Sequence, residues 1–169
     1  SYPEQNVLNW APSVMFRYMF DKQHVLMFRY RGRSSTPNIE DLQEVIDITD
    51  PMNLRYGNPN LKPSFNNNFT LDYRKFVPES MRSYTANLFY TNTLNSVANR
   101  MSYDPETGAR VYKKENVNGN WQARGYFSFN TPLKNKKFTI SSNTNARYSD
   151  AVSYTSVGNS KNADRKSVV

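Results

Sequence analysis

Apolar and polar side chains alternate along two segments near the start of the chain. Residues 13–20 and 24–31 each follow a period of two, and three polar residues, Asp21, Lys22 and Gln23, separate them. One face of the pair collects apolar side chains: Val14, Phe16, Tyr18, Phe20, Leu26, Phe28 and Tyr30. The opposite face collects Arg17, Arg29 and Arg31. Two alternating segments joined by a short polar turn predict a β-hairpin.

The same alternation continues along most of the chain. It predicts strands at 13–20, 24–32, 68–76, 84–103, 109–130 and 137–149. Short turns allow pairing only between neighbouring antiparallel strands, so the expected fold is all-β, an antiparallel up-and-down meander. Two of these segments are about three times the average strand length of roughly 5–6 residues. Strands of that length favour the wall of a large transmembrane β-barrel.

Residues 33–65 break the alternation and are expected to form a long structured loop. Prolines at 37, 51, 59 and 63 interrupt any strand ladder, and Tyr56-Gly57-Asn58-Pro59-Asn60 is dense in turn-forming residues. Thr36-Pro37 can begin a short helix, with one apolar stripe formed by Ile39, Leu42, Val45 and Ile46. Alternation of short turns with longer excursions is typical of outer-membrane barrels.

Composition excludes several classes of protein. The chain has 169 residues, no cysteine and one histidine, His24, so thiol chemistry and histidine-based triads or metal clusters cannot be assembled, and no enzyme and no cofactor are expected. No apolar run reaches the 18 residues of a transmembrane helix. The net charge of +8 is spread along the chain, which argues against nucleic-acid binding.

Two places invite a metal-site interpretation. His24 lies beside the Asp21 turn, where a lone histidine is expected to be a solvated turn residue because metal sites need several ligands. Asp104 and Glu106 could suggest calcium, but their spacing lacks an ordered ligand set, so we interpret residues 104–108 as a tight reversal. No metal site is expected.

Two stretches around the long loop resemble TonB-dependent outer-membrane receptors. They are residues 33–42 and 50–63, the latter containing Gly57-Asn58-Pro59-Asn60-Leu61-Lys62-Pro63. The sequence is most similar to the Bacteroidetes-type outer-membrane β-barrel family, in which a GNPxLKP segment precedes a strand like 69–76. Residues 118–121 and 131–137 are similar to that family too, and the resemblance covers most of residues 9–155.

This resemblance implies a partial outer-membrane β-barrel domain over 1–169, of six or seven strands. A complete receptor carries a signal peptide, an energy-coupling box, a plug and roughly twenty-two strands, so we expect a fragment of a receptor that imports a scarce nutrient such as a siderophore or glycan. The implied location is the bacterial outer membrane. The implied partners are outer-membrane lipid, the remainder of the barrel and its plug, and indirectly the TonB system.

The barrel interpretation assigns roles to both faces and to the loop. Aromatic residues would meet lipid, and the polar positions would face the lumen, since a charge at bilayer mid-depth costs about 2–4 kcal/mol: Arg17, Arg29, Asp72, Arg74 and Arg124. Five loop residues could contact a nutrient at the extracellular mouth, or could simply shape the backbone: Asp50, Arg55, Asn58, Asn60 and Lys62.

A second class of protein fits the same alternation: a soluble or surface-anchored β-sandwich that binds glycans through aromatic side chains. Strands of five to eight residues around a closed apolar core would favour the sandwich. Strands longer than twelve residues in an open, two-faced sheet would favour the barrel wall.

Overall fold

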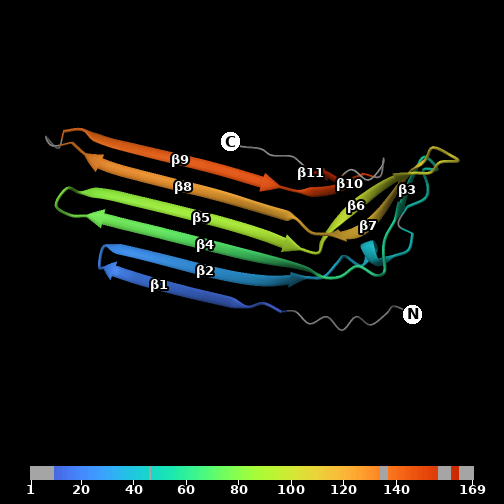
Figure 1. Ribbon diagram of the computed structural model, residues 1–169, viewed down its shortest axis with the longest axis horizontal. Helices are drawn as coiled ribbons and strands as arrows, with labels where there is room; N and C mark the ends of the chain where they lie inside the picture. Colours follow the sequence, from blue (N-terminus) through green and yellow to red (C-terminus); the bar gives the residue numbers. More distant parts are fainter. Residues whose placement is uncertain (1–9, 46, 134–136, 156–160, 164–169) are drawn as a thin grey trace.

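The computed structural model describes residues 10–45, 47–133, 137–155 and 161–163, and its main element is a long antiparallel sheet of six strands (Figure 1). The order across this long sheet is β1-β2-β4-β5-β8-β9. Its members are β1 (Ser13–Asp21), β2 (His24–Ser35), β4 (Ser64–Val77), β5 (Arg82–Leu94), β8 (Asn120–Pro132) and β9 (Thr139–Asp150). The all-β antiparallel meander is therefore confirmed.

Short turns join the strands at one end of the long sheet. Lys22 and Gln23 connect β1 to β2, and the main-chain N–H of Gln23 donates to the Asp21 carboxylate at 2.7 Å. Residues 78–81 connect β4 to β5. The connection from β8 to β9 begins at Leu133, whose N–H donates to the carbonyl of Phe138, and residues 134–136 within it lie outside the described part. The predicted short turns thus share one rim.

The opposite end carries two long excursions, residues 36–63 between β2 and β4 and residues 95–119 between β5 and β8. The predicted strands 84–103 and 109–130 are wrong as single strands, because each divides at this level. Asn95 adopts a left-handed φ of 51° between β5 and β6 (Ser96–Tyr103), and Gly119 adopts 108° between β7 (Arg110–Val117) and β8. These two residues bend the hairpin out of the long sheet.

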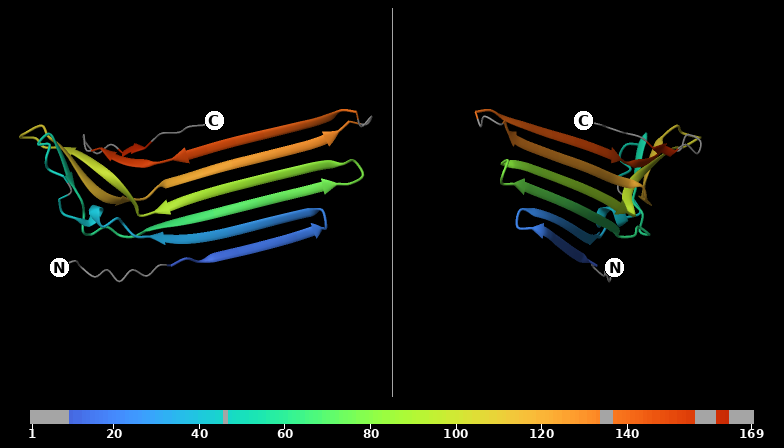
Figure 2. Two further views of the ribbon diagram at one scale, coloured as in Figure 1. Left: turned by 180° about the vertical axis from the view of Figure 1, so that it is seen from behind. Right: turned by 60° about the vertical axis from the view of Figure 1, so that its left-hand side comes forward.

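The excursions and the segment after β9 build a second sheet of order β11-β10-β6-β7-β3 at the end opposite the short turns (Figure 2). It includes β3 (Asn53–Tyr56), β10 (Val152–Thr155) and β11 (Lys161–Ala163). β3 pairs with β7, and β10 with β6, in parallel, which differs from the neighbour-only pairing expected from the sequence. Eleven strands are described rather than six or seven, because the loop supplies β3, the bent hairpin supplies β6 and β7, and the segment after β9 supplies β10 and β11.

The expected loop 33–65 is shorter and more ordered than predicted. β2 extends to Ser35, β4 begins at Ser64, and β3 lies between them. The expected short helix reduces to one 3-10 turn, Glu40–Leu42, and Ile39 and Val45 of its predicted apolar stripe are exposed. Ile46 lies outside the described residues.

The buried core is small and lies away from the long sheet. Among the residues whose burial is described, the buried apolar ones are Leu61, Ala109 and Val117, all in the excursions or the second sheet. On the long sheet, apolar side chains stay open: Phe16 is 56% exposed, Leu88 55% and Phe127 45%. Within the described residues, the long sheet is therefore open on both faces, and its edge strands are β1 and β9.

Candidate functional site: the two faces of the long sheet

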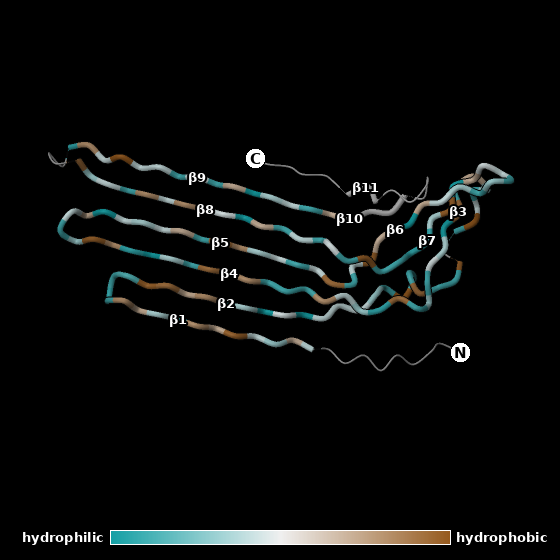
Figure 3. Tube along the Cα trace, in the orientation of Figure 1, coloured by the Kyte–Doolittle hydropathy of each residue, from teal (hydrophilic) through white to brown (hydrophobic). Residues whose placement is uncertain are grey.

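One face of the long sheet is apolar across its middle. Register places one row across the strands that contains no charged or hydrogen-bonding side chain: Phe16, Phe28, Leu71, Leu88, Gly125 and Ala146. A parallel row contains Tyr18, Leu26, Tyr73, Ala86, Phe127 and Thr144. Brown stretches follow teal ones along β4 in Figure 3, and the register assigns every second residue of each strand to this apolar face.

Aromatic rings border the apolar middle on the side of the long excursions. Five rings from five strands form a continuous chain, which we name the loop-side aromatic row: Tyr30, Phe69, Tyr90, Trp121 and Tyr148. Successive ring centroids along it lie 4.9, 6.0, 5.9 and 4.9 Å apart. The Tyr30 hydroxyl donates to the Asn67 side chain at 2.8 Å, so the polar end of that ring has a partner.

A second aromatic group borders the apolar middle near the short turns. We name it the turn-side aromatic group, and it contains Phe20, His24, Tyr84 and Phe129. Phe129 and Trp121 on β8 belong to opposite borders and lie about 27 Å apart along the strand at about 3.4 Å per residue. Tyr84 and Tyr90 on β5 lie about 20 Å apart by the same arithmetic. Outer-membrane barrels carry an apolar band of about 25 Å between two aromatic girdles, and these spacings are of that order.

His24 differs from its expected role as a solvated turn residue. It opens β2, its ring stacks on Phe20 at 4.1 Å between centroids, and it meets the ring of Tyr73 edge-on at 5.2 Å. Among the described residues its Nε2 has no hydrogen-bond partner. The expectation of a solvated residue is wrong because the period of two along β2 puts His24 on the apolar face with Leu26, where it contacts the rings of Phe20 and Tyr73.

The opposite face is polar, and it collects the residues predicted to face a lumen. The register puts Arg17, Arg29, Asp72, Arg74 and Arg124 on this one face, which is the grouping expected from alternation. It also carries three arginines that were not among the predicted lumen residues, Arg31, Arg33 and Arg147. Their positions on alternating strands could have identified them in the same way.

Contacts on the polar face organise part of this charge. Arg29 Nη2 lies 2.6 Å from a carboxylate oxygen of Asp72, and the Asn87 amide donates to the other oxygen. Arg124 instead lies over an aromatic ring, with its guanidinium carbon 4.8 Å from the centroid of Phe89. Closer to the excursions, threonine hydroxyls donate to asparagine side chains across strands, Thr91 to Asn68 at 3.0 Å and Thr93 to Asn66 at 2.7 Å. The face is thus a hydrogen-bonding surface of high positive charge.

The five loop residues proposed for nutrient contact do not form one cluster. Asn58 and Asn60 line a hollow of about 330 Å³ beside Glu44 and Lys113, whereas Asp50, Arg55 and Lys62 do not line it. The Asn58 amide donates to the carbonyl of Lys114 at 3.1 Å. Asn60 donates its main-chain N–H to the Asn58 side chain at 2.9 Å, so both residues shape the backbone.

A clamp fastens this loop to β7. The amide of Asn116 donates to the carbonyls of Lys62 at 2.9 Å and Asn95 at 2.8 Å, and its oxygen accepts from the main-chain N–H of Lys62 at 2.7 Å. Gly57 packs so tightly that a Cβ there would lie 2.1 Å from the carbonyl oxygen of Gln43. The glycine and asparagines of the GNPNLKP segment therefore stabilise the conformation of the loop, which accounts for their presence.

Exposed carboxylates stabilise turns in the excursions. Hydrogen bonds from the Asn53 side chain and the Met52 main chain hold the pKa of Asp50 below its usual value. Hydrogen bonds from the Thr49 hydroxyl and main chain lower the pKa of Asp47 in the same way. The N–H of Glu106 lowers the pKa of Asp104, which confirms residues 104–108 as a reversal. Asp50 is thus a turn-stabilising residue.

Two features are absent from the described part of the chain. No three histidine, cysteine or acidic side chains come together as a metal site there. No helix among those residues is long and apolar enough to cross a membrane.

Comparison with known proteins identifies the family. The model of the outer membrane protein beta-barrel family matches residues 1–168. The chain belongs to this family. No curated protein and no solved structure matches the chain. Family membership points to the bacterial outer membrane as its location.

The family and the open sheet also decide between the two interpretations of the alternation. β4 has 14 residues, β5 and β8 have 13 each, and both faces of the long sheet are open over the described residues. These are the features expected of a barrel wall. A sandwich would need shorter strands around a closed apolar core, and the long sheet covers no such core there.

Proposed function

We propose that this chain forms part of the barrel wall of a TonB-dependent receptor that imports a scarce nutrient across the outer membrane. The apolar face between the loop-side aromatic row and the turn-side aromatic group contacts lipid. The polar face lines the lumen, and the plug and remaining strands complete the barrel. No chemical step on the solute is part of this function.

The two aromatic borders carry the lipid assignment. A soluble sheet needs an apolar face to pack a core, but it has no need to join rings from five strands into one continuous row across the sheet. Aromatic rings with a polar tip favour the membrane–water interface, so two such levels mark the two borders of a bilayer. Because short turns gather at one rim and long excursions at the other, the excursions lie on the extracellular side.

The transport assignment rests on two observations: the six-stranded long sheet does not close into a barrel by itself, and the sequence resembles TonB-dependent receptors. Small barrels close with about eight strands, whereas the described long sheet has six strands with β1 and β9 as edges. Edges of this kind demand pairing partners, which further strands of a larger barrel provide. The GNPNLKP segment and its surroundings add the resemblance to TonB-dependent receptors.

Genetic epistasis in the source bacterium tests the proposal. Deleting the gene for this protein should produce slow growth on one scarce nutrient, and deleting the gene for TonB should produce the same defect. The double deletion should be no worse than either single deletion. Uptake of that nutrient that continues at full rate without TonB would overturn the transport assignment while leaving the barrel intact.

A further inference from the structure

The polar face carries far more positive than negative charge. Its exposed arginines are Arg17, Arg29, Arg31, Arg33, Arg74, Arg124 and Arg147. On the described strands of the long sheet, Asp72 is the acidic residue on this face, and its carboxylate already accepts hydrogen bonds from Arg29 and Asn87. Most of this positive charge therefore has no acidic partner in the described part of the chain.

One row across the strands concentrates the excess. The register aligns Met15, Arg29, Thr70, Phe89, Arg124 and Arg147. Arg124 on β8 and Arg147 on β9 are direct cross-strand partners, and among the described residues neither forms an ion pair. Like charges directly opposite one another destabilise strand pairing. The contact of the Arg124 guanidinium with the Phe89 ring offsets part of this cost, whereas no ion pair among the described residues offsets the charge of Arg147. The remaining cost indicates that the two guanidinium groups serve an anionic ligand.

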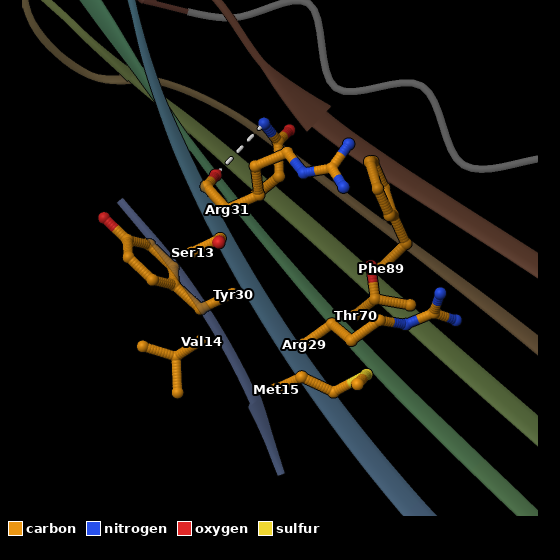
Figure 4. A pocket seen from close by; sticks show the side chains of 9 residues that line it. Ser13, Val14, Met15, Arg29, Tyr30, Arg31, Thr70 and Phe89 are labelled. Carbon is orange, nitrogen blue, oxygen red and sulfur yellow. Dashed lines mark hydrogen bonds between the residues drawn. The ribbon is translucent and has the colours of Figure 1, made fainter. Parts of the chain in front are cut away.

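A second positive group lies on the other side of Phe89. A hollow of about 560 Å³ is lined by Arg29 and Arg31 together with Asn68, Thr70 and Phe89. Figure 4 shows Arg29, Thr70 and Phe89 around this hollow, with Arg31 beside them. Three strand spacings of about 4.8 Å separate the backbones of β2 and β8 by about 14 Å, and the Arg124 guanidinium extends from β8 over Phe89 on the strand between them. That separation suits a ligand with more than one anionic group.

We propose that the polar face binds a solute bearing at least two carboxylate or phosphate groups. One anionic group lies between Arg124 and Arg147, the second enters the hollow at Arg29 and Arg31, and Phe89 forms the floor between them. Guanidinium forks bind carboxylate and phosphate oxygens in pairs, which a neutral solute cannot exploit. The inference rests on the proposed function, because the polar face lines a solute path only in a barrel.

Calorimetric titration of the protein, purified from outer membranes in neutral detergent, tests this proposal. The probes are tripolyphosphate, inorganic phosphate and neutral maltotriose, each at low and high salt. We expect tripolyphosphate to bind more tightly than phosphate, more weakly at high salt, and maltotriose not to bind. Arg147→Gln and Arg124→Gln should each weaken tripolyphosphate binding about ten- to a hundredfold, the loss of a charge-assisted contact. Arg147→Lys should fall between, because it keeps the charge without the fork.

Arg74→Gln is the matched control, since Arg74 is an exposed arginine of the same face outside the row. Equal weakening by Arg74→Gln would show diffuse charge attraction and overturn the site. Unchanged tripolyphosphate binding in Arg124→Gln and Arg147→Gln, with a lower unfolding temperature, would assign the arginines to an acidic surface of the protein itself. Failure of anion binding with intact TonB-dependent uptake overturns only this inference, whereas TonB-independent uptake overturns only the proposed function.

Discussion

Replacing Phe127 with arginine tests which face of the long sheet meets lipid. Phe127 lies on the apolar face of β8, and its neighbour Tyr126 lies on the polar face at the same depth. Both side chains are aromatic and similarly exposed, 45% for Phe127 and 37% for Tyr126. Tyr126→Arg is therefore a matched control in which the same charge is placed on the other side of the same strand.

The cost of Phe127→Arg depends on the depth of Phe127 in the bilayer. An arginine on the lipid face costs about 2–4 kcal/mol at the bilayer midplane and about 0–1 kcal/mol near the interface. Phe127 lies two residues, about 7 Å along the strand, from Phe129 of the turn-side aromatic group. We therefore expect Phe127→Arg to destabilise the inserted protein by about 2 kcal/mol, a shift of about 30-fold in the folding equilibrium. Tyr126→Arg loses one exposed hydrogen bond to Asn143, so its cost should stay below about 1 kcal/mol.

Urea titration of folding into phosphatidylcholine vesicles measures both costs, with heat-dependent gel mobility reporting the folded fraction. The wild type and Tyr126→Arg should share nearly the same urea midpoint, and the midpoint of Phe127→Arg should fall clearly below it. Equal costs for the two substitutions would refute the reasoning, because the two faces would then contact the same solvent. A Phe127→Arg substitution that leaves the urea midpoint unchanged would also refute the reasoning.

Three further predictions concern the excursions and the exposed apolar face. Gly57→Ala should destabilise the loop by about 1–3 kcal/mol, because the new Cβ would lie 2.1 Å and 2.5 Å from the backbone oxygens of Gln43 and Asp41. Gly125→Ala should be tolerated, because the nearest atom to its Cβ would lie at 3.4 Å, and limited proteolysis compares the two variants. Because the pKa of Asp50 is lowered, its ionised form stabilises the turn; this stabilisation is fully present above the unfolded value of 3.8 and is lost as the pH falls through the folded value. The protection of the Met52 amide against hydrogen exchange should therefore decrease below about pH 4, and Asp50→Ala, which removes the acceptor oxygen, should decrease it at every pH. Without detergent the protein should scatter light as aggregates, because its apolar face and its β1 and β9 edges are open; a monodisperse monomer in plain buffer would contradict the barrel wall.

Local alternation was enough to predict the long sheet. The hairpin around Lys22 was predicted almost to its ends because a period of two persists across both strands and the turn between them is short and polar. The division of faces followed automatically, since one assigned residue fixes every other residue of its strand. Arg17, Arg29, Asp72, Arg74 and Arg124 therefore share a face as predicted, and this part of the fold is encoded within about ten residues at a time.

The second sheet was not predictable in this way. The alternation continues through Asn95 although its left-handed backbone ends β5, and the Asn118-Gly119 turn signal was readable but overridden by the long pattern. Parallel pairing of β3 with β7 joins segments more than fifty residues apart. The Asn116 clamp is also a long-range contact. Nothing local in the sequence indicates that Asn116 faces Lys62.

The aromatic borders are a functional feature that the sequence of a single strand does not reveal. Each strand contributes a ring that, taken alone, is indistinguishable from a residue of a soluble core. Alignment emerges only from register, which places Phe69 opposite Tyr90 and Trp121 within 5.9 Å of Tyr90. A core is satisfied by apolar volume at any height along the strand, so packing alone does not select one level. An interface between water and lipid does select one, because a ring there must keep its apolar body and its polar tip on opposite sides of a plane. The level of the rings, rather than their number, is therefore what distinguishes a membrane-facing sheet from a buried one.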